Sequence, residues 1–466
     1  MTERSRLNKL PEDILLRILV LTEISTVLTL SQVNSHLHAI TSVKQLWVLL
    51  TSDLLTRGLI DIPLEDVSVM SSEDFKAEVK RAVCGPRTWS PDSEDITAPL
   101  RRYTVPLEDD RAFSAVLLPG GKYLVLHKHT DRSDTHLLEC WDVRARRCVW
   151  AWSRIGATFS ETRFTICRGT KIVASLALIE ESSSQLLLLE LDLDTGHYRE
   201  ISRISPFHPF SRAFQLVDDY FGCVCSTDMT FPPKIKLLLI NHQTQQYLTF
   251  DYSITATDIC IVPGYVFLTS TRFEPGSVRA YSMVSLEPFW QPLAEFDPNN
   301  MPSASALAPS SVFLVGEHIV RADYSQSQPL ELSFAMDQSL LRRESYLLQF
   351  TERDANQHVR MVFMLRLDFS SVQGPRCVLL SSVTSDDHVD PAEQAIEIDQ
   401  WHCRGGYSLS PERLSKEWIT VMRRKDCEPK QFKLEDDIHR ARFVGLSPNG
   451  GLVVLHSASA DIFYYE

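Results

Sequence analysis

The stretch LLELDLDTGHYREI, residues 188–201, indicates the fold class of most of the chain. Leucines alternate with acidic residues up to a turn at Asp194, Thr195 and Gly196, and a second extended segment follows. Alternation with a period of two that is interrupted by turn residues predicts a β-hairpin. Residues 138–150 repeat the pattern, because LECWDV leads through a short polar turn to CVW.

Weaker copies of this hairpin recur along the chain. They lie around Asn241, Ser282, Asp323, Asp368 and Arg423. Steps of roughly 40–55 residues between the copies match the repeat length of four-stranded propeller blades. Residues 101–466 are therefore predicted to form a large all-β propeller. Seven blades are favoured and eight are the alternative, because residues 385–431 are irregular.

The hairpin around Trp141 and Asp142 resembles the WD-repeat family, of which this ring would be a degenerate, WD-repeat-like member. Leucine-rich repeats need a period of 20–29 residues, and only residues 186–193 resemble one. Gly-Gly pairs at 120–121, 405–406 and 450–451 are typical of kelch blades but do not recur at a kelch spacing.

The two ends of this region complement each other. After residue 441 only three strand-like segments are present, at 442–446, 452–455 and 461–465. A spare strand, residues 102–107, precedes the first complete blade. Pairing the spare strand with the last three would close the ring and remove exposed strand edges.

Residues 7–84 have helical character instead. LPEDILLRIL, residues 10–19, begins with proline and two acids, and its apolar residues have helical spacing. Ser25 is predicted to cap a second helix, and a third is predicted to carry Val33. A fourth helix is expected to run from about residue 42 to Gly58. Residues 71–83 predict a further amphipathic helix with a capping box, and residues 87–99 a linker or docking arm.

The order and spacing of LPEDIL, IL, LxxVNxxL and LW between residues 10 and 47 resemble the F-box family. This resemblance implies a three-helix module that binds the Skp-type adaptor of a cullin–RING ubiquitin ligase. The matching positions would form the adaptor-binding residues: Leu10, Pro11, Ile14, Leu15, Ile18, Leu19, Val33, Leu37, Leu46 and Trp47.

The predicted organisation is therefore α+β and multidomain. It consists of an F-box helical domain at 7–57, a helical connector and linker at 58–100, and a propeller at 101–466 that binds an unknown protein substrate. The expected function is substrate recognition in an SCF-type E3 ubiquitin ligase, without catalysis by this chain. The alternatives are an F-box scaffold that does not direct ubiquitination, an enzyme on a propeller, or helices that only cap the large domain.

Composition limits the other functions. The chain has 466 residues, which is enough for two or more domains, and a formal charge of −13 that disfavours nucleic-acid binding. No membrane span is expected, because no run of about 18 apolar residues occurs. Ten scattered cysteines and a charged start favour a reducing compartment, cytoplasmic or nuclear.

Other reactive residues do not form a recognisable catalytic, cofactor or metal motif, and no cofactor or metal is expected. His127, His129 and His136 are a conceivable metal site, but solvated or capping histidines are favoured. Cys223, Cys225 and the pair at 402–403 lack zinc-ligand spacing. The basic residues at 342–343 and 423–425 could bind a phosphorylated substrate, or could simply be a solvated charged face.

Overall fold

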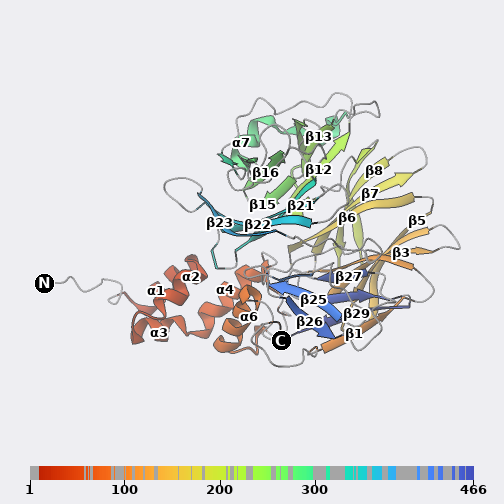
Figure 1. The fold of residues 1–466 in the computed structure, drawn as a ribbon. Coiled ribbons are helices and arrows are strands. Elements are labelled where there is room, and N and C mark those ends of the chain that lie inside the picture. The colour runs from red at the N-terminus through yellow and green to blue at the C-terminus, as the bar shows by residue number, and fades with distance from the viewer. Residues whose placement is uncertain are drawn as a thin grey trace.

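The computed structural model contains mostly β-strands, preceded by a few helices (Figure 1). The structure describes residues 10–56, 59–60, 62, 67–84, 89, 99, 101–107, 111–118, 121–130, 135–155, 157–168, 171–180, 184–205, 208–209, 215–217, 219–226, 235–252, 259–262, 264–270, 277–297, 311–314, 331–339, 341–342, 345–353, 359–369, 376–384, 407–409, 418–423, 429–433, 443–446, 451–456 and 458–465. Within these residues no helix is both long enough and apolar enough to cross a membrane.

The helical module consists of α1 (Glu12–Leu21), α2 (Ile24–Leu30), α3 (Ser35–Thr41), α4 (Lys44–Thr56) and α6 (Ser72–Cys84). One buried cluster joins them. It includes Leu15 of α1, Val27 of α2, Trp47 of α4 and Phe75 of α6. Because α6 shares this cluster, the helical core includes a helix from the predicted connector at 58–100.

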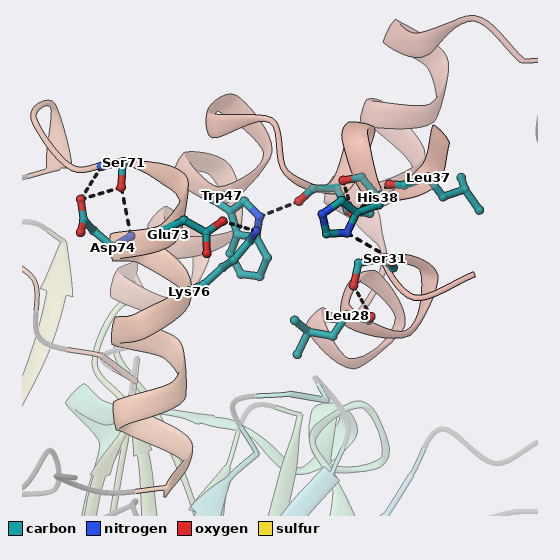
Figure 2. A network of polar contacts seen from close by, with 10 residues as sticks. Leu28, Ser31, Leu37, His38, Trp47, Ser71, Glu73, Asp74 and Lys76 are labelled. Atoms are coloured by element: carbon teal, nitrogen blue, oxygen red, sulfur yellow. Dashed lines mark hydrogen bonds and ion pairs between the residues drawn. The ribbon is translucent and has the colours of Figure 1, made fainter. Parts of the chain in front are cut away.

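The start of α6 has the predicted capping box. The Asp74 carboxylate accepts hydrogen bonds from the Ser71 backbone N–H and hydroxyl, both at 2.7 Å, and the Asp74 N–H donates to Ser71 Oγ at 3.2 Å (Figure 2). These bonds from Ser71 lower the pKa of Asp74. Two groups that would otherwise lack partners at the helix start are thereby satisfied.

The strands form seven antiparallel sheets among the described residues. Sheet B contains β2 (Arg111–Leu117), β3 (Tyr123–Thr130), β4 (Thr135–Asp142) and β5 (Arg147–Ile155), and sheet C contains β6 (Ala157–Arg168), β7 (Lys171–Glu180), β8 (Ser184–Asp192) and β9 (Tyr198–Ile204). The hairpins predicted at 138–150 and 188–201 are thus confirmed. Gly196 in the second turn has φ of +71°, and a Cβ there would lie 2.4 Å from the carbonyl oxygen of Val149.

Sheet D contains β10 (His208–Pro209), β11 (Gln215–Val217), β12 (Tyr220–Ser226), β13 (Ile235–Asn241), β14 (Gln246–Tyr252) and β18 (Gln291–Pro292). Sheet E contains β15 (Ile259–Val262), β16 (Tyr265–Ser270), β17 (Ser277–Ser282) and β19 (Ser311–Leu314). Between β17 and β19 the chain forms α7 (Met283–Leu286) and the 3₁₀ turns η3 (Glu287–Phe289) and η4 (Leu293–Glu295), and reaches β14 through β18. This excursion was not predicted from the sequence.

Sheet F contains β20 (Glu331–Gln338), β21 (Ser345–Arg353), β22 (Val359–Asp368) and β23 (Arg376–Thr384), and sheet G contains β24 (Tyr407–Leu409), β25 (Trp418–Arg423) and β26 (Pro429–Lys433). Of the repeat positions inferred from the sequence, Asn241, Ser282, Asp368 and Arg423 each end a strand. Asp323 lies outside the described residues.

Sheets B, C, D and E pack face to face in succession, and this packing makes the β region propeller-like. Three buried clusters join sheets B and C, C and D, and D and E. Tyr265 of sheet E stacks on Phe369, which directly follows β22 of sheet F, with ring centroids 4.4 Å apart. β6, β11, β15 and β20, which lie at or near the start of sheets C, D, E and F, also contact one another in succession.

The predicted pairing of the two ends is confirmed in sheet A, whose strand order is β1 (Arg101–Pro106), β29 (Ser459–Tyr464), β28 (Leu452–Leu455) and β27 (Phe443–Leu446). β1 pairs with β29 from Arg101 opposite Tyr464 to Pro106 opposite Ser459. All four residues of β28 are buried, as expected for a central strand. One buried cluster then joins sheets A and B.

Candidate functional site: an exposed apolar stripe on the first helix

α1 has two apolar stripes that face different surroundings. Leu15 and Leu19 are each only 2% exposed and belong to the buried cluster of the module. Ile14, Ile18 and Leu21 are 38%, 39% and 76% exposed. A helix of a soluble domain normally covers its second face with polar residues, so an apolar second face indicates a surface for a partner.

Proline and two acids define where α1 begins. Pro11 is the N-cap with φ of −54°, and its carbonyl oxygen accepts the N–H groups of Ile14 and Leu15, both at 3.1 Å. Glu12 and Asp13 lie in the first turn, where negative charge complements the helix dipole. Leu10 directly precedes this turn and is 38% exposed. We define the apolar stripe as Leu10, Ile14, Ile18 and Leu21.

The start of α3 and the start of α2 each differ from a sequence prediction. Val33 lies in the turn between α2 and α3, not in a helix, and is 61% exposed. Asn34 is the N-cap of α3, and its side chain accepts the Leu37 N–H at 2.9 Å. Asparagine is among the best N-cap residues, so α3 begins after Val33. The prediction for α2 also differs from the structure: Ser25 does not cap α2 but lies inside it, because the N-cap position is occupied by Glu23.

Trp47 supports the module from inside and does not reach its surface. The ring is 1% exposed, and its Nε1 donates to the Thr41 carbonyl oxygen at 2.7 Å (Figure 2). Lys76 of α6 lies over the ring with its Nζ 5.7 Å from the centroid. Trp47 therefore ties together the end of α3, α4 and α6.

The ten residues predicted to bind an adaptor thus divide into two sets. The exposed set is Leu10, Pro11, Ile14, Ile18 and Val33. The buried set is Leu15, Leu19, Leu37, Leu46 and Trp47. Only the exposed set can contact a partner without rearrangement, and the buried set holds the exposed set in place. Sequence reasoning missed Leu21, the most exposed member of the stripe, although its spacing of seven residues from Ile14 places it on the same face.

The other candidate residues remain dispersed. His127 Nε2 lies 3.0 Å from His136 Nδ1, but within the described residues no three potential metal ligands are gathered. Cys223 and Cys225 are buried, and burial raises the pKa of Cys225 to about 12. Arg342 lies between β20 and β21, and Arg423 ends β25. The pair at 402–403 and the basic residues 343, 424 and 425 lie outside the described residues.

Neither the known protein families nor the curated proteins include a match to this chain. Solved structures with a similar fold include an oligogalacturonate lyase from Vibrio parahaemolyticus, which is 9% identical, with 80% of this chain and 98% of that chain covered and a TM-score of 0.40. Another is Sqt1 of Chaetomium thermophilum bound to the N-terminus of ribosomal protein L10, at 8% identity, 79% and 100% coverage and a TM-score of 0.40. The C-terminal WD40 domain of Sif2 matches at 10% identity, 80% and 99% coverage and a TM-score of 0.33.

These comparisons correct one expectation. The chain was expected to have no catalytic activity, but the structures with a similar fold include oligogalacturonate lyases, which are enzymes.

Proposed function

We propose that this chain is a substrate-recognition subunit of an SCF-type E3 ubiquitin ligase. In this proposal the helical module binds the Skp-type adaptor, and through it a cullin–RING ligase, while the sheets A to G form a closed seven-bladed propeller that binds a protein substrate. Such ligases act in the cytoplasm and the nucleus, so the proposal places this chain in one or both of these compartments.

The observation that supports the proposal most is the exposed stripe on α1. Its four residues belong to the segment whose landmarks resemble the F-box family, and the helix beneath them is fixed by a buried core. Complete burial of a leucine or isoleucine side chain contributes about 1.5–3 kcal/mol before the cost of association. Leu10, Ile14 and Ile18 are only 38–39% exposed before binding, so each adds a part of this amount and Leu21 adds the largest part.

The location of the stripe also bears on the simplest alternative, in which the helices only cap the sheets. That alternative requires the apolar residues of α1 to face the sheets. Ile14, Ile18 and Leu21 are instead exposed, and α1 lies on the side of the module away from the sheets (Figure 1). The exposed face thus favours a separate partner.

Affinity purification followed by mass spectrometry tests the proposal. The wild-type chain is expected to recover a Skp-type adaptor and a cullin, and the Leu10→Ala/Pro11→Ala variant is expected to lose both. Candidate substrates that are recovered with both the wild-type chain and the variant would be assigned as proteins that bind the sheets. Undiminished recovery of the adaptor by the variant would refute the F-box assignment. Recovery of the adaptor without any substrate ubiquitination would favour the scaffold alternative.

A further inference from the structure

We infer that the helical module and the sheets are held as one rigid unit by two separate clamps, one at the start of α2 and one at Trp89. Neither clamp involves the apolar stripe, so the stripe would keep a fixed direction relative to the sheets while remaining open to a partner. The inference concerns this chain alone and does not depend on the identity of the partner.

The first clamp completes the N-terminus of α2. The first four N–H groups of a helix have no partner within it, and at α2 the N-cap residue Glu23 makes no side-chain capping bond. Two of these N–H groups find backbone carbonyl acceptors. The Thr26 N–H donates to the Glu23 carbonyl at 2.9 Å, and the Ser25 N–H donates to the Leu341 carbonyl at 3.2 Å.

Leu341 belongs to the hairpin between β20 and β21 of sheet F, more than 300 residues further along the chain. Its side chain is half-buried and packs on the hydrophobic cluster of the helical module. The hairpin itself is closed by hydrogen bonds from the Ser339 N–H to the Ser345 carbonyl at 2.8 Å and from the Arg342 N–H to Ser339 Oγ at 3.3 Å. A closed hairpin thus inserts one apolar side chain and one carbonyl into the module.

The second clamp lies between α6 and the first strand. Trp89 follows the end of α6 by five positions and is 1% exposed. Its ring lies 5.3 Å from that of Tyr465, which directly follows β29 and is 4% exposed. The chain is therefore held on sheet A before it enters β1.

Two contacts restrict motion of the helical module relative to the sheets more than one contact would. A single contact leaves a hinge about itself, whereas the contact of α2 with sheet F and the contact of Trp89, five positions after α6, with sheet A together oppose rotation about either point. Interfaces between domains of one chain usually permit relative motion unless they are extensive. In this chain the Leu341 carbonyl at the start of α2 and the buried ring of Trp89 would limit that motion without an extensive interface.

The distance distribution between the two parts tests this inference in the full-length chain. Spin labels on non-canonical amino acids at His36 of α3 and Tyr198 of β9, both exposed, avoid the native cysteines. The wild-type chain is expected to give one narrow distribution. Leu341→Asp combined with Trp89→Ala should broaden it at least twofold, and each single variant should broaden it less. Arg342→Ala is the matched control, because Arg342 is exposed beside Leu341.

Amide hydrogen exchange separates loss of the clamp from loss of folding. In Leu341→Asp, the Ser25 amide should lose about tenfold or more of its protection, whereas the Leu19 amide inside α1 should keep its protection. A wild-type distribution that is already broad would overturn the inference. So would a double variant as narrow as the wild type with Ser25 still protected. Because no adaptor is present, neither result bears on the proposed function.

Discussion

Asp461 shows how a single buried charge fastens the two ends of the β region. It is 2% exposed and accepts hydrogen bonds from Thr104 Oγ1 at 2.6 Å and from the Arg102 guanidinium at 3.1 Å, both on β1, and it lies 3.3 Å from His456 Nε2. Burial by itself would raise the pKa of Asp461. The hydrogen bonds from His456, Thr104 and Arg102 outweigh burial and lower the pKa to about 2.

We predict that Asp461→Asn destabilises the chain at neutral pH. Because the pKa in the folded chain is lower than in the unfolded chain, the ionised carboxylate stabilises the fold above pH 4, by about 2 kcal/mol. This stabilisation is lost as the pH falls from about 4 to about 2. Denaturant unfolding of both proteins should therefore give a difference in free energy at pH 7 that shrinks toward pH 2. A difference independent of pH would contradict the assigned role of the carboxylate.

At the scale of single elements, α1 and α4 show why sequence alone could not separate contact residues from core residues. The landmarks of the segment fixed the positions of α1 and α4, but a residue such as Trp47 matches the family pattern whether it is exposed or buried. Its burial depends on α6, which lies outside the matched segment. Likewise, no local signal in residues 339–345 indicates that Leu341 completes α2.

Trp47→Ala is predicted to abolish adaptor binding by unfolding the module, not by removing a contact. Truncation of a buried tryptophan costs about 3–5 kcal/mol, and here a hydrogen bond to Thr41 is lost as well. Far-ultraviolet circular dichroism should show a loss of helix together with the loss of binding. Ile18→Ala, at an exposed position of the stripe, should weaken binding and leave the helical signal unchanged. A fully helical Trp47→Ala protein that does not bind would instead place Trp47 in the interface.

For the whole molecule, the hairpin repeat and the pairing of the two ends followed from the strand pattern, because alternation and turn residues are local signals. The path through α7 and β18 did not follow, because it depends on contacts between sheets D and E. The closed ring of seven blades remains part of the proposal.

Truncation should affect the two ends differently. Deletion of residues 1–86 should remove adaptor binding and leave a soluble sheet region. Deletion of residues 461–466 removes most of β29, which lies between β1 and β28, and should leave both strands with open edges that promote aggregation. Size-exclusion chromatography and thermal melting would compare the two proteins. A monodisperse, cooperatively melting protein after the six-residue deletion would refute the role of β29 in closing the sheets.

The central claim is that the stripe on α1 binds a Skp-type adaptor, and calorimetric titration of the purified chain with purified adaptor tests it most directly. Ile14→Asp/Ile18→Asp places two charges in the stripe and is predicted to weaken binding at least about a hundredfold, or nearly 3 kcal/mol. Val284→Asp is the matched control, because Val284 on α7 is 70% exposed and lies outside the module. The account predicts binding by the wild type and the control and a large loss in the double variant. Equal affinities for all three proteins, or no binding by the folded wild type, would contradict it.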